Sequence, residues 1–225
     1  MRHELSEGST SVNISRDSVN ARGERTRVKI IVTAEKLFAE FGIDGVATRV
    51  IALESGQHNK MAVEYHFSDR VGLVRAIFVY REVALSEIRR KLYVEARRMH
   101  TLRSVRSLMR ILYEPIFIHY RDNDGISYVK LMMHYLSTYR QKGLLHPVEE
   151  LPFTRIFRIA YGRLRDTAGF VDNRLYLRRM GAVGALFLSA IIQHSARGVG
   201  FRDESPDEFF EDTIEMMVGA LLAKY

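Results

Sequence analysis

The sequence contains no cysteine. This absence excludes disulfide bonds, thiolate nucleophiles, sulfur-ligated zinc and redox sensing through thiols. An export signal is missing as well, because residues 1–23 are polar and charged and contain no apolar core of signal-peptide length. We therefore expect a cytoplasmic protein.

Long hydrophobic runs are scarce. The longest uncharged run, residues 180–196, falls short of the ~20 apolar residues that span a bilayer, and it contains Gln193 and His194. It predicts a helix that is buried against other parts of the protein. We expect no association with a membrane.

Recognisable catalytic patterns are missing too. The sequence has no HExxH motif, no glycine-rich phosphate loop and no ordered set of Ser, His and Asp. We therefore expect a protein that is not an enzyme and that has no cofactor and no metal site.

What the sequence does have is a large apolar fraction and a positive charge. Of its 225 residues 47% are hydrophobic, which is enough for one large domain or two small domains tightly joined. The net charge of +7 favours a polyanionic partner, because each phosphate neutralised by Lys or Arg releases condensed counterions. A basic surface that only keeps the protein soluble fits this charge equally well.

After residue 24 the apolar residues recur three and four positions apart, and no convincing alternating strand is present. The sequence thus predicts an all-α fold of about nine helices. The signals that stop these helices are polar or glycine-containing turns at Gly42, Gly56, Asp122–Gly125, Gly143–Pro147, Gly169 and Gly198–Pro206.

This pattern divides the chain into a flexible polar tail (residues 1–24), a head (residues 25–70) and a helical body (residues 71–225). The tail carries scattered arginines that could follow a DNA minor groove, namely Arg16, Arg22 and Arg25. A solvated tail without a role is the alternative.

The head has the pattern of three short helices. A first helix over residues 25–41 is stopped by Gly42, and a second, TRVIALES, has Thr48 as its predicted N-cap. After a tight turn, Asn59 can cap a third helix over residues 60–66. The predicted inward-facing residues are Ile30, Ala34, Leu37, Phe38, Phe41, Ile51, Ala52, Ala62 and Val63.

The successions AEKLFAEFG, ATRVIALESG and YHFSDRVGL, in this order, resemble the signature of the TetR family of transcriptional regulators. The resemblance rests on the Phe-x-x-x-Gly end of the first helix, the Thr-x-x-Ile-Ala of the second, the turn glycine, and Tyr-His-Phe followed by a basic residue and Leu. It implies a helix-turn-helix DNA-binding head and a helical body that binds a ligand and dimerises. A three-helix packing unit that does not touch DNA is the alternative.

The resemblance also implies roles for single residues. Thr48 and Tyr65 would hold DNA phosphates, and Phe67 would lock the third helix into the head. Arg70 would lie near the start of helix four, where it and the free amides can bind a phosphate together. Ten residues, QHNKMAVEYH, separate Gly56 from Phe67, one more than is commonest in the family, so we expect a longer turn.

The first residues of the third helix would lie nearest the base edges of the major groove. Asn59 and Lys60 are the leading candidates for base contacts, because an amide can pair with adenine and a lysine can donate to guanine. Glu64 could accept from a cytosine amine or point away. The complete predicted DNA-binding set is Thr48, Arg49, His58, Asn59, Lys60, Met61, Glu64, Tyr65, His66 and Arg70.

The body begins with helix four, roughly residues 69–98, which starts apolar and becomes strongly charged. Such a helix suits a solvent-flanked connector that can transmit a shift. The segments 105–120, 128–139 and 153–164 are rich in Met, Phe, Tyr and His, and Pro115 would kink the first of them. They predict an apolar ligand pocket, or else plain core, and the candidate lining residues are Met109, Tyr113, Phe117, Met132, Met133, Tyr135, Phe157 and Tyr161.

The last two helices predict a homodimer interface. The first, opened by Asp172 or Asn173, offers small residues for close helix packing, namely Gly181, Ala182, Gly184, Ala185 and Ala190. The second opens with a capping box at residues 205–208. Its apolar face is too wide for a lone terminal helix and consists of Phe209, Phe210, Ile214, Met217, Val218, Leu221 and Leu222. Pairing across a two-fold axis would bury this face, and a core within one chain is the alternative.

Together these patterns favour a homodimeric repressor that reads a pseudo-palindromic DNA operator and is released by a small, largely apolar effector. The second hypothesis is a helical small-molecule-binding protein or enzyme in which the head is only structural. Turnover without salt-dependent DNA affinity would favour it. The third is non-specific coating of DNA, which predicts an affinity that barely distinguishes sequences.

Overall fold

The computed structural model describes residues 10–59, 61–139, 151, 154–197 and 204–224. Within these residues it contains nine α-helices, one π-helical segment and no β-strand, so the predicted all-α fold is confirmed. The first helices are α1 (Thr10–Phe41), α2 (Thr48–Glu54) and α3 (Ala62–Phe67). They are followed by α4 (Arg70–Arg98), α5 (Val105–Asp122), α6 (Ile126–His134), η1 (Tyr135–Tyr139), α7 (Arg155–Thr167), α8 (Asn173–Ser195) and α9 (Pro206–Leu222).

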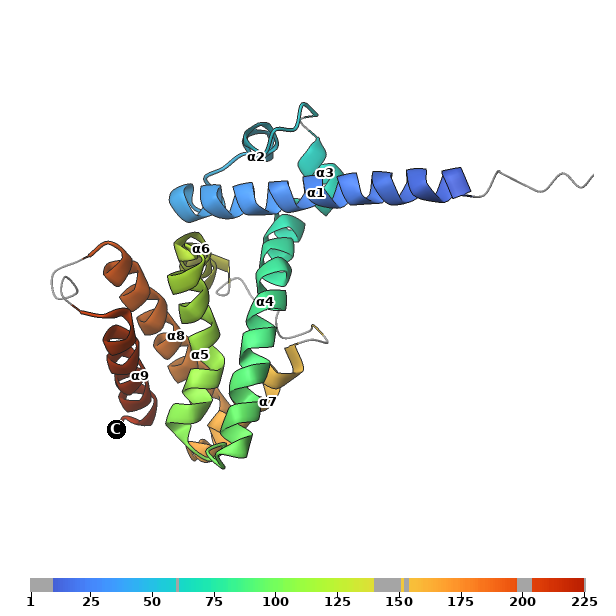
Figure 1. The fold of residues 1–225 in the computed structure, drawn as a ribbon. Coiled ribbons are helices and arrows are strands. Elements are labelled where there is room, and N and C mark those ends of the chain that lie inside the picture. The colour runs from blue at the N-terminus through green and yellow to red at the C-terminus, as the bar shows by residue number, and fades with distance from the viewer. Residues whose placement is uncertain (1–9, 60, 140–150, 152–153, 198–203, 225) are drawn as a thin grey trace, which may run out of the picture.

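The helices form a small head and a larger bundle (Figure 1). In Figure 1, α1 lies across one end of the molecule, with α2 and α3 on its outer side and the bundle on its other side. α4 begins beside the head and runs down the bundle, and α1 packs against both α4 and α6. The first helix therefore belongs to the head and also rests on the body.

The first helix is longer than its periodicity indicates. It begins at Thr10 instead of at about residue 25. Residues 10–24 contain no proline and one glycine, so nothing blocks the extension of a helix whose later turns are fixed by packing. Arg22 and Arg25 consequently lie on a helix, where both are exposed.

The other end of α1 corrects one predicted core residue. Phe41, expected to face inward, is 57% exposed. Gly42 stops the helix directly after it, with a φ of 79° that a side chain would disfavour. Ile43 and Val46, which follow this turn, are buried in place of Phe41.

Side-chain caps fix where several body helices begin. The Asp69 carboxylate accepts from the Gly72 amide at 2.7 Å at the start of α4, and Asp172 caps α8. At the start of α9, the Ser205 hydroxyl accepts from the Glu208 amide while the Glu208 carboxylate accepts from the Ser205 amide. This reciprocal arrangement is the predicted capping box.

The apolar face of α9 is largely covered by its own chain. Its core residues, which are at most 3% exposed, are Phe209, Phe210, Ile214, Met217 and Leu221. They pack on α5 and α8. These residues, predicted to form a face too wide for a lone terminal helix, are thus covered within the chain, whereas Leu222 is exposed and Val218 is half-buried.

α8 is long and apolar enough to cross a membrane, judged by length and composition. Such a helix also occurs as a core helix of a globular bundle. Here Val183, Phe187 and Ile191 are buried, and α8 contacts α6 and α9. Its first turns carry the exposed Arg174 and Arg178, so α8 is a core helix of this bundle.

Candidate nucleic-acid interface and ligand cavity

The head buries one side of α2 and α3 and exposes the other. Ile51, Ala52 and Val63 are fully buried, as predicted from their spacing. On the outer side Tyr65 is 83% exposed and Met61 is 60% exposed. The outer face also carries three exposed polar residues of the predicted DNA-binding set, namely Arg49, His58 and Asn59. It therefore presents cationic, amide and aromatic groups to solvent.

The start of the third helix differs from the prediction. α3 begins at Ala62, and its N-cap is Met61, which makes no side-chain cap. Asn59 lies in the preceding turn, where its side-chain oxygen accepts from the Met61 amide at 2.9 Å and its carbonyl accepts from the Ala62 amide at 3.1 Å. Asn59 therefore caps the turn that precedes α3, whereas the predicted helix start at residue 60 is two residues too early. Lys60, the other leading candidate for base contact, lies outside the described residues.

Thr48 and Glu64 contact each other across the two helices. The Thr48 hydroxyl donates to a Glu64 carboxylate oxygen at 2.7 Å, and the second oxygen of that carboxylate is buried without a partner among the described residues. α2 has Ala47 as its N-cap, so the predicted cap by Thr48 is wrong. The Glu64 side chain therefore points towards the start of α2. The contact joins α2 to α3.

Arg70 also makes an internal contact. Its guanidinium donates to the carbonyl oxygen of Ile43, in the loop after α1. Among the first amides of α4, which are expected to help Arg70 hold a phosphate, that of Gly72 donates to the Asp69 carboxylate. Arg70 therefore ties the start of α4 to the loop after α1.

Phe67 ends α3 and fixes it against α1 as expected, because its ring is buried with the Arg27 guanidinium 5.3 Å from its centre. A strained turn then connects α3 to α4. Ser68 then has a φ of 68°, and the Asp69 amide donates to the Phe67 carbonyl at 2.8 Å. This is a γ-turn with positive φ, an uncommon and strained conformation for a serine.

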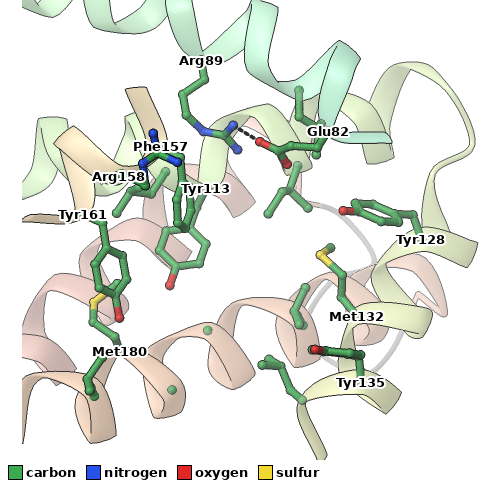
Figure 2. Close-up of a pocket in the computed structure, with 18 of the residues that line it drawn as sticks. Glu82, Arg89, Tyr113, Tyr128, Met132, Tyr135, Phe157, Arg158, Tyr161 and Met180 are labelled. Atoms are coloured by element: carbon green, nitrogen blue, oxygen red, sulfur yellow. Dashed lines mark hydrogen bonds and ion pairs between the residues drawn. The ribbon is translucent and has the colours of Figure 1, made fainter. Parts of the chain in front are cut away.

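A cavity of about 480 Å³ lies within the bundle, between α4, α5, α6, α7 and α8 (Figure 2). This volume suits a small organic molecule. The predicted lining residues that do line it are Tyr113, Met132, Tyr135, Phe157 and Tyr161. Three others do not line it, namely Met109, Phe117 and Met133, because they pack against neighbouring core side chains, as Phe117 does against Phe210.

Two glycines of α8 widen this cavity. Leu177, Gly181, Gly184 and Leu188 follow one another at spacings of four, three and four and all line it. A Cβ placed on Gly181 would meet no atom within 4 Å, and one on Gly184 would lie 3.6 Å from the Tyr113 hydroxyl. These glycines, predicted for close packing between helices, instead leave room for a ligand.

A buried ion pair forms the polar wall of the cavity. Glu82 and Arg89 lie two turns apart on α4, are joined by a hydrogen bond, and have side chains only 3% and 2% exposed. The Arg89 guanidinium also lies 5.2 Å from the centre of the Phe157 ring. Burial raises the pKa of the Glu82 carboxyl, although Arg89 acts in the opposite direction. Neither residue was predicted to line the cavity, because their segment has the pattern of a solvated face. Only their spacing of seven places them on the same side of α4.

A second ion pair joins the head to the body. Arg81 donates to both oxygens of the Glu35 carboxylate, at 2.6 and 2.9 Å, and Ser127 donates to the same group at 2.6 Å. On α4, Arg81 faces the head and the next residue, Glu82, faces the cavity. On α6, Ser127 contacts Glu35 of the head helix, and the next residue, Tyr128, lines the cavity. The wall of the cavity and the contact with the head are therefore one residue apart on both helices.

His119 is buried near this link. Its ring lies 6.0 Å from that of Tyr128, and its Nε2 has no partner among the described residues. Burial lowers the pKa of the His119 imidazole, the positive charge of Arg81 lowers it further, and Glu35 opposes both. In the described part of the chain no group of three or more His, Asp or Glu side chains could hold a metal ion.

Comparison with known proteins gives a match among solved structures only. No protein-family model matches the chain, and no curated protein matches it. A crystal structure assigned to a TetR-family transcriptional regulator from Mesorhizobium loti covers 90% of this chain and 97% of its own, at 18% identity and a TM-score of 0.46. The chain is similar to a TetR-family regulator. At this identity, what its head and its cavity do has to be inferred from its own residues.

Proposed function

We propose that the protein is a DNA-binding transcriptional regulator of the TetR type, a homodimeric repressor that a small molecule in the cavity releases from its operator. The observation that carries this proposal is the pair of adjacent residues Arg81 and Glu82 on α4. One contacts Glu35 of the head helix, and the other lines the cavity. A ligand that moves this turn of α4 therefore acts directly on the helix that supports the head.

The response requires that the ligand prefer one of two arrangements of α4. A ligand that binds both arrangements equally shifts neither. A ligand that prefers the arrangement in which Arg81 is displaced would also move Glu35 and α1. The reason is that the Glu35 carboxylate accepts three hydrogen bonds from α4 and α6. In a dimer, that displacement changes the spacing of the two heads and weakens binding to an operator of fixed half-site spacing.

On the DNA side, we assign the exposed residues of the head to two kinds of contact. Tyr65 and Arg49 suit phosphate oxygens, with His66 and Thr48 beside them. The turn before α3 would contact base edges through Asn59 and its neighbours His58, Lys60 and Met61. Thr48, Glu64 and Arg70 hold the head together first, and any DNA contact they make is secondary.

The dimer surface is the outer side of α8 and α9. Ala182 on α8 and Gly219 and Ala220 on α9 are exposed, and the larger Met216 and Leu222 beside them are 46% and 44% exposed. Small residues allow a close approach of helices, and apolar ones favour removal from water. This surface is narrower than the sequence suggests, since the main apolar face of α9 is covered within the chain.

The proposal is tested by measuring DNA affinity by fluorescence anisotropy over a series of salt concentrations. A duplex selected from random sequences is compared with a scrambled one. The double variant Arg49→Ala with Tyr65→Ala should lose specific binding, whereas Arg90→Ala, at an exposed site of α4, should retain it. Equal binding by the wild type and the double variant would contradict the proposal, and turnover of a substrate without DNA affinity would favour an enzyme.

A further inference from the structure

The buried pair of Glu82 and Arg89 uses only part of its capacity for hydrogen bonds. The two bonds that the Glu82 carboxylate accepts from described residues, Ser86 and Arg89, both end on its Oε1. A guanidinium offers five N–H donors, and that of Arg89 makes one hydrogen bond within the described part of the chain, through Nη1 to Glu82. Its Nε is buried without an acceptor. Native structures rarely leave buried polar groups so poorly paired.

The unused groups of the pair are accessible from the cavity. Among the unpaired polar atoms of these two side chains, only Arg89 Nε is closed to solvent. Glu82 Oε2 and Arg89 Nη2 therefore remain accessible, and both residues line the cavity while being almost fully buried otherwise. In Figure 2 the two side chains lie side by side and extend from α4 towards the other lining residues. The pair thus offers a ligand an acceptor and a donor next to each other.

The pair is balanced in charge. Arg158 also lines the cavity, but it is exposed and donates to the Leu151 carbonyl at 3.2 Å, so it adds no buried charge. A carboxylate or an ammonium group would therefore enter without a counter-charge and would compete with one member of the pair for the other. An uncharged ligand leaves the pair intact.

The rest of the cavity is apolar and aromatic. The stripe of α8 that ends in Leu188 offers aliphatic carbon and the space left by Gly181 and Gly184. The rings of Tyr113 and Tyr161 line it as well. This surface buries a hydrocarbon chain or an aromatic ring.

We propose that the effector is an uncharged amide with an apolar body. Its carbonyl oxygen accepts from the Arg89 guanidinium, an N–H on the same side donates to Glu82 Oε2, and the body lies along α8. A primary amide or a lactam places an acceptor and a donor side by side without a net charge, which matches the pair. Hydrogen bonds to ionised groups are stronger than those between neutral groups. The inference rests on the proposed function for the word effector, whereas the binding itself does not depend on it.

The test uses matched probes on the full-length protein. Straight-chain primary amides from hexanamide to decanamide, and ω-phenyl amides, are each compared with the methyl ketone, the acid and the amine of the same body by isothermal titration calorimetry. The methyl ketone has nearly the same shape and keeps the carbonyl, but it lacks the N–H donor. At least one amide should bind about tenfold tighter than its methyl ketone, and its acid and amine should bind more weakly than the amide. The inference is overturned if no amide exceeds its methyl ketone, or if an acid or an amine is the tightest ligand of its set.

Variants locate the binding. Glu82→Met with Arg89→Met replaces the buried pair by side chains of similar volume, which proteins often tolerate, and it should bind the amide no tighter than the methyl ketone. The control Glu87→Met with Arg90→Met removes an exposed pair of the same helix and should keep the preference for the amide. A preference that persists in the cavity variant, or that is lost in the control, would overturn the inference.

A third variant serves if the cavity variant does not fold. Gly181→Leu fills the cavity and leaves the pair in place, and a Cβ at this site meets no atom within 4 Å. It should fold and should no longer bind the amide. Amide binding of unchanged affinity in this variant would place the ligand outside the cavity and would overturn the inference.

Amide binding and DNA release are then measured separately. Amide binding with the predicted pattern supports the ligand chemistry even if the protein shows no specific DNA affinity, in which case the regulator proposal alone fails. Specific DNA binding without any preference for the amide overturns the ligand chemistry alone. Release of DNA by the amide, but not by its methyl ketone at the same concentration, supports both.

Discussion

The link between Glu35 and Arg81 gives a sharp prediction, because the two partners differ in their access to water. The Glu35 side chain is 1% exposed, whereas that of Arg81 is 20% exposed. Removing Arg81 leaves a buried carboxylate with a single hydroxyl donor, that of Ser127. Removing the charge of Glu35 leaves a guanidinium that can turn towards solvent.

The expected costs follow from this asymmetry. Arg81→Met should lower the free energy of unfolding by about 4 kcal/mol, within the range for breaking a buried ion pair. Glu35→Gln should lower it by about 2 kcal/mol, the loss of charge-assisted hydrogen bonds. The double variant should cost less than Arg81→Met alone, because no buried charge remains unpaired. For a chain of this size, the loss in Arg81→Met corresponds to a fall in Tm of roughly 8–16 °C.

The assay is urea unfolding followed by circular dichroism, with the wild type, both single variants and the double variant forming a cycle. The exposed pair Glu87–Arg90, whose side chains are 52% and 54% exposed, serves as the reference cycle and should show a coupling close to zero, because water and salt screen the two charges. The reasoning is refuted if Glu35→Gln costs more than Arg81→Met. It is also refuted if the Glu35–Arg81 coupling is no larger than that of the reference pair.

Three further predictions concern the cavity, the buried histidine and the turn after α3. Gly181→Leu should keep or raise the Tm, because the site has room for a side chain and glycine disfavours a helix, and it should abolish ligand binding in a thermal shift assay. Burial holds the pKa of His119 below its ordinary value of 6.5, so the unfolded chain binds the proton more readily and stability should fall as the pH drops below about 6.5. His119→Leu should flatten the dependence of stability on pH between pH 7 and pH 5, whereas the control His100→Asn, at an exposed site, should not. An unchanged dependence on pH in His119→Leu would contradict the burial of His119 as a neutral group. Ser68→Gly should raise the free energy of unfolding by about 0.5–1 kcal/mol, because glycine adopts a positive φ without strain. A lower free energy of unfolding in this variant would contradict the inference that Ser68 is strained.

Several helix faces and helix ends could be predicted because their signals are local. The spacing of Ile51 and Val63, the stop at Gly42 and the capping box of α9 depend on residues within a few positions of one another. Such patterns fix helix faces and ends without knowledge of the rest of the chain.

The cavity could be predicted only in part, because burial of charge depends on distant elements. Aromatic and methionine spacing located Tyr113 and Tyr161. Glu82 and Arg89 lie in a charged stretch whose local pattern is that of a solvated face, and they are buried because distant helices cover them. For the same reason the contact of Thr48 with Glu64 was missed, since it joins two helices across a turn.

The central claim is that occupation of the cavity controls binding of DNA by the head. The most direct measurement is a selection of bound duplexes from random DNA, repeated in the presence of a small molecule that raises the Tm of the wild type but not that of Gly181→Leu. The proposed mechanism predicts enrichment of an inverted repeat by the wild type and loss of that enrichment with the small molecule. The double variant Glu35→Gln with Arg81→Met should enrich the same repeat but should not respond to the small molecule. Enrichment of no repeat, or equal release by the small molecule from the wild type and the double variant, would contradict the proposed control of the head by the cavity.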